Sequence, residues 1–183
     1  MSSVLQTIFD RYTCRDFTSE PIDKEHVESI VKAALAAPSA MNIQPWHIIA
    51  ITNKKLIDEL DADAMSVLKE QGGESYKRIN DRGGKIFYNA PCLIVIARNS
   101  TDYAALDTGI ATQNIALTAH DLGLASVICG MARIPLNGPR ADEWVQRLQI
   151  PNGYVFGMSV CIGKARSSKT PHELDLSKVT YIR

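Results

Sequence analysis

Two arginines stand four positions apart near the start of the chain, with a hydroxyl residue midway between them. The stretch FDRYTCRDF supplies Arg11, Thr13 and Arg15, and its flanks have the character of one helix end and the approach to a second helix. A guanidinium group presents a planar fork of donors that matches phosphate oxygens, and a hydroxyl with exposed backbone amides completes a small anion cradle. The pattern indicates an anion site. The plainer alternative is a solvated arginine pair at a helix end, which contributes little to stability.

A second polar group lies in the stretch APSAMNIQPW, residues 37–46. It contains Ser39, Asn42 and Gln44 between a helix stop and a strand. Asn and Gln side chains each carry both donors and an acceptor, which suits a heterocycle with mixed edges such as a flavin or a purine. The alternative is a simple turn, since Pro, Ser and Asn are turn formers.

The motifs of several other chemistries are missing. The sequence has no GxGxxG dinucleotide fingerprint, no GxxxxGK[ST] phosphate loop and no GxSxG elbow. Its cysteines form no CxxC pair and its four histidines show no metal spacing, so no metal site is expected. Cys92 and Cys161 lie within apolar runs and are expected to be buried free thiols.

Length and composition indicate one domain over residues 1–183. The 20 basic residues balance the 20 acidic ones, and this argues against a nucleic-acid partner. No apolar run is long enough to span a bilayer, and no secretory leader is visible, so no membrane partner is expected. These features predict a soluble, cytoplasmic protein.

Hydrophobic periodicity predicts five helices that separate the polar motifs. Asp23 and Asn53 are candidate caps, Pro38 ends the second helix, and Gly123 ends a long helix that is apolar on nearly all sides. The expected helices fall at residues 4–11, 21–38, 53–70, 102–124 and 139–149. A helix as apolar as the fourth is usually central or shared between subunits.

Apolar runs between these helices predict the strands. They fall at residues 46–52, 91–97, 125–130 and 154–163, with a further candidate, VTYI, at 179–182. Residues 70–84 are polar and glycine-containing and are expected to form a mobile loop with a helical turn. Helices alternating with strands indicate α/β or α+β architecture.

Three of these segments, in the same order, resemble the FMN-dependent nitroreductase family in its short form. RYTCRDF resembles the opening R-x-S-x-R-x-F signature, with threonine in place of serine. AAPSAMNIQPWHIIAIT resembles the A-P-S-x-x-N-x-Q-P-W element that enters the first strand. DTGIATQNIALTAHDLGLASVICG resembles the long helix, short strand and flavin loop. The resemblance covers nearly the whole chain. It implies an α+β fold, a three-layer α-β-α sandwich with a mostly antiparallel sheet and a central long helix.

The resemblance also assigns roles at the amino end and after the third strand. Arg11 and Arg15 would bind the FMN phosphate, with Thr13 assisting and Tyr12 in the same site. The loop at Cys129 and Gly130 would lie against the isoalloxazine ring, with a backbone amide near the flavin N5 atom, where hydride arrives and leaves.

Family members are homodimers with two FMN sites at the interface. Ser39, Asn42 and Gln44 match positions that reach the flavin from the partner subunit. The C-terminal VTYIR would form a swapped strand that adds to the other subunit's sheet.

The chain departs from the family pattern near its end and in one loop. A basic pair usually follows the last core strand and meets the phosphate. Here GKARSSKTPHEL offers Lys169 as the preferred match and Arg166 as the second, and Pro171 stands near where an arginine is often found. Cys129 occupies a position where acidic or small residues are frequent. A structural thiol is the simpler interpretation, and a reactive thiol beside the flavin is the alternative.

The implied activity is that of a ping-pong oxidoreductase. NADH or NADPH would reduce FMN and leave, and a small flat acceptor such as a nitroaromatic, a quinone or a free flavin would then be reduced. No side chain is assigned a catalytic role, because the flavin carries the chemistry. The alternatives are a specialised relative (a dehalogenase, an enone reductase or an enzyme that fragments reduced flavin) and a module that stores or senses FMN without turnover.

Overall fold

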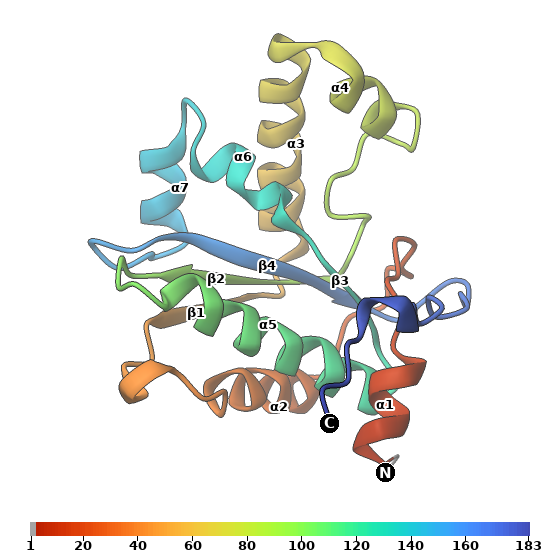
Figure 1. The fold of residues 1–183 in the computed structure, drawn as a ribbon. Helices are drawn as coiled ribbons and strands as arrows, with labels where there is room; N and C mark the ends of the chain where they lie inside the picture. The colour runs from red at the N-terminus through yellow and green to blue at the C-terminus, as the bar shows by residue number, and fades with distance from the viewer. Residues whose placement is uncertain (1–2) are drawn as a thin grey trace.

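A four-stranded antiparallel sheet forms the middle layer of the molecule (Figure 1). The structure, a computed structural model, describes residues 3–183. The strand order is β1-β2-β4-β3, so the two longest strands lie in the middle and the shorter two at the edges. The strands are β1 (Trp46–Ile51), β2 (Cys92–Arg98), β3 (Ala125–Ile128) and β4 (Val155–Gly163). All four lie where the apolar runs predict them.

Strand β2 is apolar along its length because both of its faces are buried. Leu93 and Val95 belong to one core cluster, whereas Cys92 and Ile94 belong to the other. Successive side chains of a strand point to opposite faces of the sheet. The absence of polar alternation in this run therefore reflects helices packed on both sides.

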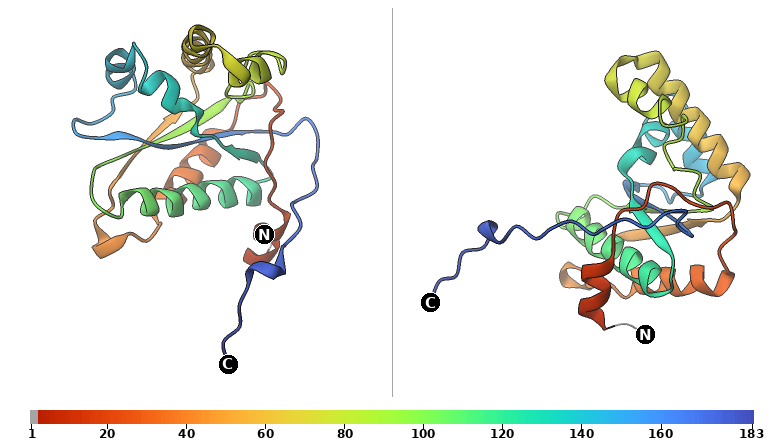
Figure 2. Two further views of the ribbon diagram at one scale, coloured as in Figure 1. Left: turned by 45° about the horizontal axis from the view of Figure 1, so that its top comes forward. Right: turned by 90° about the vertical axis from the view of Figure 1, so that its right-hand side faces the viewer.

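Helices cover both faces of the sheet and make three layers (Figures 1 and 2). One face carries α2 (Lys24–Leu35) and α5 (Ala104–Asp121), which pack against each other and against the sheet. The other face carries α3 (Lys54–Gln71), α6 (Arg133–Leu136) and α7 (Ala141–Arg147). The expected α+β sandwich, its antiparallel sheet and its long helix are confirmed.

The long helix α5 is held in place along its length. Thr108, Ala111, Ile115 and Ala119 are among its buried residues. The side-chain amide of Asn114 donates to the carbonyl of Ala33 on α2, with 2.9 Å between nitrogen and oxygen. Within residues 3–183 no helix combines the length and apolar character that crossing a membrane requires.

Helix boundaries follow most of the sequence signals, with two differences. Asn53 caps α3 through its side-chain oxygen, which accepts from the backbone of Leu56. Asp23 occupies the cap position of α2 but makes no side-chain hydrogen bond there. The expectation of a loop at residues 70–84 is wrong for most of that segment, because it contains the two-turn helix α4 (Gly73–Asn80).

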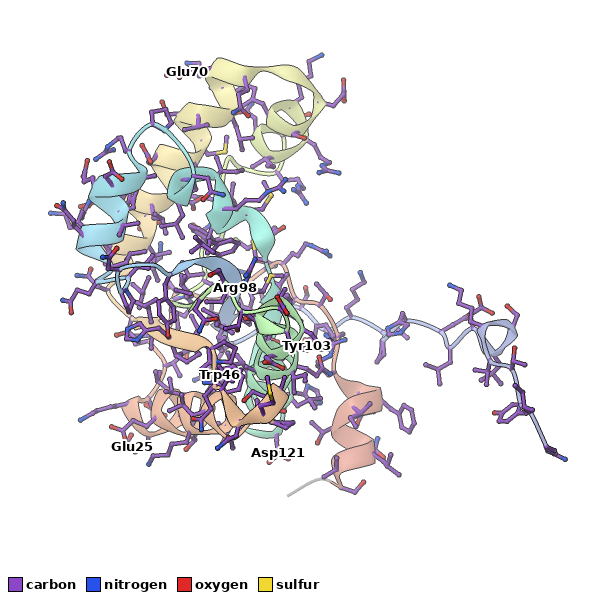
Figure 3. The ribbon with its side chains drawn as sticks, turned by 60° about the vertical axis from the view of Figure 1, so that its left-hand side comes forward. Glu25, Trp46, Glu70, Arg98, Tyr103 and Asp121 are labelled. Carbon is purple, nitrogen blue, oxygen red and sulfur yellow. The ribbon has the colours of Figure 1, made fainter. Side chains whose placement is uncertain are left out.

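The two ends of the chain lie outside the three layers. Helix α1 (Val4–Asp10) precedes the arginine motif. The last residues form a short 3₁₀ turn at Leu176–Lys178 and otherwise extend away from the body (Figure 3). Residues 179–182 form no strand within this single chain. Whether they pair with a second copy stays a prediction.

A buried carboxylate joins α3 to α7 on the upper face. The indole nitrogen of Trp144, which is fully buried, donates to Asp63 Oδ2 over 2.7 Å. Arg140 Nη1 donates to the other oxygen over 3.1 Å. This contact holds the α6–α7 segment, which directly follows the loop after β3, against α3.

Replacing Asp63 with alanine should therefore destabilise the fold. The change leaves the buried indole N–H without an acceptor and removes the partner of Arg140. We expect the free energy of unfolding, measured in urea, to fall by about 3 kcal/mol. Glu143→Ala removes an exposed partner of the same arginine and should change the free energy of unfolding by less than about 1 kcal/mol. Equal effects of the two substitutions would contradict this account.

Candidate functional site

The segment that carries the arginine pair is held against the edge of the sheet. The backbone N–H of Cys14 donates to the carbonyl of Ser126 in β3 over 3.0 Å. Phe17, which is 1% exposed, forms a bridge with Ala165 just after β4. Cys14 is also buried. These anchors fix the backbone between them and leave the polar side chains of the segment free to face outward.

A cavity of about 290 Å³ opens beside this segment. Its lining includes Tyr12, Thr13 and Arg15 from the motif, together with Lys169 from the C-terminal region. Residues 154 positions apart in the sequence, Arg15 and Lys169, thus share one cavity. The tyrosine hydroxyl reaches the carbonyl of Ser167 over 3.4 Å, which links the two segments.

Arg11 lies at the end of α1 and contributes a buried donor. Its Nε atom is buried and has no hydrogen-bond partner among the described residues. A buried donor without an acceptor is costly, because its lost hydration is not replaced. An anion bound next to the motif would supply the missing acceptor. The Arg15 guanidinium, the Thr13 hydroxyl and the Lys169 ammonium group that line the cavity fit a phosphate, and Arg11 is a further donor in the same segment.

Arg166, the second candidate from the C-terminal region, is engaged elsewhere. Its Nε atom lies 3.2 Å from Asp16 Oδ1 and donates to the carbonyl of Phe17, also over 3.2 Å. Arg166 thus fastens the C-terminal segment to the arginine motif, and it does not line the cavity. The geometry favours Lys169 for a contact with an anion.

The Ser39–Gln44 segment forms a compact polar turn. The backbone N–H of Gln44 donates to the Ser39 hydroxyl over 2.9 Å, and the Gln44 side chain donates to Asn42 Oδ1 over 3.1 Å. The backbone of Ala40 donates to the buried carboxylate of Asp107 on α5. The Asn42 and Gln44 side chains are exposed and both residues have positive φ, so the turn is held in one conformation with its polar groups outward.

The turn and the arginine motif lie at opposite ends of the folded molecule, although they are close in the sequence. In Figure 1 the turn, which includes the 3₁₀ segment Ala40–Asn42, is at the lower left, whereas the arginine segment follows α1 on the right, and the left-hand view in Figure 2 agrees. A single chain therefore does not bring Ser39, Asn42 and Gln44 to the cavity at Arg15.

The loop after β3 places Cys129 inside the core and Gly130 at the surface. The Cys129 N–H donates to the carbonyl of Ser159 over 2.8 Å, and the Ser159 hydroxyl donates back to the Cys129 carbonyl. The loop backbone is thereby fixed to β4.

The Cys129 thiol is enclosed. A hydrogen bond from Cys161 and, more weakly, the charge of Arg15 lower the pKa of the Cys129 thiol, against the opposing effect of burial. The thiol is nevertheless only 4% exposed, and its hydrogen points to the carbonyl of Ile86, 3.6 Å away. Closed access favours the structural interpretation of Cys129.

A second cavity, of about 230 Å³, is also lined by Arg15. Its lining includes Arg78 and Arg82 from the end of α4 and just beyond it, and Met131 from the loop after Gly130. These arginines were not among the predicted site residues, although their spacing in YKRINDR repeats that of Arg11 and Arg15. The signal was hidden because the segment was expected to be a loop.

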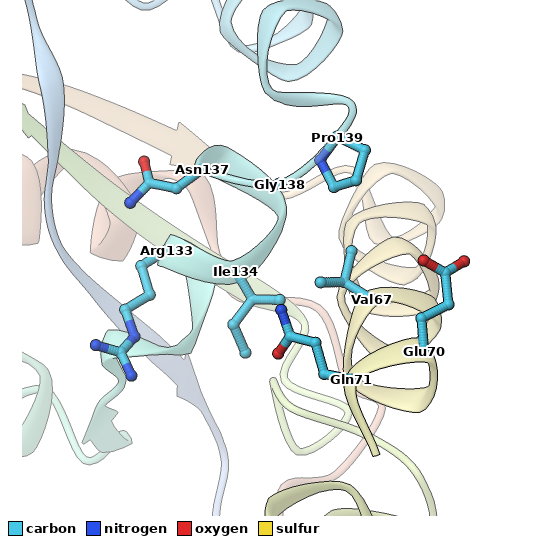
Figure 4. Close-up of a pocket in the computed structure, with 8 residues that line it drawn as sticks. All are labelled: Val67, Glu70, Gln71, Arg133, Ile134, Asn137, Gly138 and Pro139. Carbon is cyan, nitrogen blue, oxygen red and sulfur yellow. The ribbon is translucent and has the colours of Figure 1, made fainter.

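A larger cavity, of about 620 Å³, contains none of the predicted site residues. It lies between α3 and α6 and is lined by Val67, Glu70, Gln71, Arg133, Ile134, Asn137, Gly138 and Pro139 (Figure 4). In Figure 4 the Arg133 side chain points away from Val67 and Glu70. This wide space shows no convergence of charged groups.

Comparison with known proteins agrees with the geometry. A solved structure titled a nitroreductase with bound FMN, from Desulfitobacterium hafniense DCB-2, is 43% identical, with a TM-score of 0.94 over 100% of both chains. An FMN reductase (NAD(P)H) of Bacillus subtilis is 26% identical over 100% of this chain and 76% of its own length. An NADPH-flavin oxidoreductase of Vibrio harveyi is 29% identical over 89% of this chain and 66% of its own.

The model of the Nitroreductase family matches residues 8–164. This range contains the arginine motif, the Ser39–Gln44 turn and the loop at Cys129. The chain belongs to the nitroreductase family.

Proposed function

We propose that this chain is an FMN-dependent oxidoreductase that uses NADH or NADPH to reduce flat electron acceptors, such as nitroaromatic compounds and quinones, in a ping-pong order. The observation that carries the proposal is the cavity in which Thr13, Arg15 and Lys169 converge. The unpartnered Nε of Arg11, four positions before Arg15 in the same segment, adds to it. The full-length similarity to a nitroreductase that binds FMN supports it.

The residues of the cradle bind the phosphate end of FMN. Arg11 and Arg15 donate to its oxygens, Thr13 adds a hydroxyl, and Tyr12 and Lys169 complete the lining. A phosphate monoester carries close to two negative charges at neutral pH. The negative charge of the phosphate is offset here by positive groups that form no ion pair within the described residues. Charge-assisted hydrogen bonds of this kind are the strong ones.

The loop at Cys129 and Gly130 orients the ring system. When bound, FMN supplies the hydride-accepting and hydride-donating chemistry. The contribution of the chain is the backbone N–H of Gly130, which directly follows the Cys129 backbone that the Ser159 contacts hold rigid. A fixed donor needs no reorganisation during the reaction, so it stabilises developing charge effectively. No side chain acts as a general acid or base in this proposal.

A second copy of the chain completes the site. The polar turn lies at the end of the molecule opposite its own arginine motif. We therefore propose that its residues Ser39, Asn42 and Gln44 reach the flavin of the partner in a homodimer. Large apolar side chains that a monomer would leave in water support this proposal. They are Val4, Leu5, Ile8 and Phe9 on α1, and Leu174, Leu176, Val179, Tyr181 and Ile182 in the tail.

We also propose that the protein works in the cytoplasm. All four cysteines are free and buried, as expected in a reducing compartment. The cysteines have no role in the proposed reaction. Burial raises the pKa of Cys92 to about 12 and that of Cys161 well above its ordinary value, so both remain protonated at neutral pH.

The purified protein should be yellow, and its bound flavin should be bleached by NADH or NADPH without oxygen. Absorbance near the flavin maximum should then return on addition of a nitrofuran or a quinone, since the same flavin serves donor and acceptor in turn. Failure to take up FMN on reconstitution would overturn the proposal. Flavin that binds tightly but is reduced by neither nucleotide would instead support a storage module.

Reversing one charge in the cradle should release the flavin. Arg15→Glu places a carboxylate where the phosphate would bind, so the Kd for FMN, measured by fluorescence quenching, should rise at least about thirtyfold. Lys69→Glu makes the same charge change at the exposed end of α3 and serves as the matched control. Equal FMN affinity in the two variants would show that the phosphate binds elsewhere.

Light scattering should give a mass of about twice 20.1 kDa for the full chain. Removing residues 174–183 should lower the mass toward that of one chain and weaken FMN binding, because the tail no longer contacts the partner. A full-length monomer that holds FMN at full occupancy would contradict the dimer proposal.

A further inference from the structure

Three guanidinium groups surround the second cavity. Arg15, Arg78 and Arg82 line it together with Tyr88, and no acidic residue is among the lining residues. None of the three arginines forms an ion pair within residues 3–183. The chain as a whole is electrically neutral, so this concentration of positive charge is local.

The arrangement of Arg78 and Arg82 is defined by contacts within the chain. Arg82 Nε donates to the backbone carbonyl of Arg78 over 3.1 Å. The Arg82 guanidinium carbon lies 5.8 Å from the ring centroid of Tyr88, within the range of a cation–π contact. These contacts set the positions of the charges without neutralising them.

A favourable effect of helix polarity explains only part of this cluster. Arg78 lies in the last turn of α4, where a cation interacts well with the helix dipole. Arg82 lies beyond the helix and Arg15 comes from a different segment, so the dipole does not account for either. Like charges gathered around one cavity repel each other, and a bound anion removes that cost.

The remaining lining is apolar and suits a flat ring. Ile79 and Ile86 are buried, and Met131 is half-buried beside them. A volume of about 230 Å³ is at the lower end for a ligand site and accommodates one substituted ring better than a dinucleotide. Met131 follows the loop proposed to contact the flavin, so a ligand here would lie next to the reaction centre.

We infer that this cavity selects aromatic electron acceptors that carry a carboxylate or a similar anionic group. The ring packs on the apolar floor beside Tyr88, and Arg78 and Arg82 bind the anionic substituent. That the ligand is an electron acceptor rests on the proposed function, but the preference for an anionic ring is a binding property that exists without turnover.

Binding of 4-nitrobenzoate and of its neutral counterpart, 4-nitrobenzamide, tests the inference. Isothermal titration of the oxidised protein, with no reductant present, should show the carboxylate binding about tenfold more tightly. In the double variant Arg78→Gln, Arg82→Gln, the two ligands should bind with about equal affinity. Lys77→Gln removes a charge from the same helix outside the cavity and should keep the preference.

Four outcomes would overturn the inference. The first is that the wild-type protein binds the two ligands equally well, and the second is that the preference for the carboxylate survives in the double variant. The third is that the double variant loses FMN while Lys77→Gln keeps it, which would assign the cavity to the cofactor. The fourth is that the substitutions raise the KM for NADPH but not for NADH, which would assign the arginines to the donor's extra phosphate. An enzyme that binds 4-nitrobenzoate selectively but reduces no acceptor would refute the proposed function and leave this inference standing.

Discussion

The proposed site depends on positive charge that the described residues do not neutralise among themselves. Among residues 3–183, Arg11 keeps a buried Nε without an acceptor, and Arg15 lines two cavities without forming an ion pair. Both belong to a segment pinned to β3 and to the end of β4, so neither can relax far into solvent. A protein keeps such an arrangement when an external anion completes it. The phosphate of FMN is the anion that family membership and geometry jointly favour.

The proposed homodimer would complete a site of which one copy of the chain holds only part. The cradle lies at one end of the sandwich, and the exposed amides of Asn42 and Gln44 lie at the other. A two-fold axis brings the unlike ends of two chains together twice, which makes two equal sites from two incomplete ones. The apolar side chains of α1 and of the tail would then be covered by the partner and not by water. Cofactor binding and assembly would be linked events.

Much of this could be predicted from the sequence, because strong periodicity and turn residues acted locally. The buried runs of β2 and β4, the cap at Asn53 and the end of α5 near Gly123 are examples. Only a helical turn was expected where α4 lies, because glycines at positions 72, 73, 83 and 84 bracket the segment and glycine marks loops. Glu74, Lys77 and Arg78 are nevertheless good helix formers. The separation of Arg166 from Lys169 depended on long-range contacts with Asp16 and Phe17, which no local pattern encodes. The cluster of Arg15 with Arg78 and Arg82 could not be predicted either, because its members come from two distant segments, one of which was expected to be a loop.

The most direct measurement compares the affinity of the protein for FMN with its affinity for riboflavin, which lacks only the phosphate. If the arginine cradle holds the phosphate, FMN should bind about a hundredfold more tightly, and Arg11→Gln should remove most of that difference while leaving riboflavin affinity nearly unchanged. Equal affinities for the two flavins in the unaltered protein would contradict the central claim.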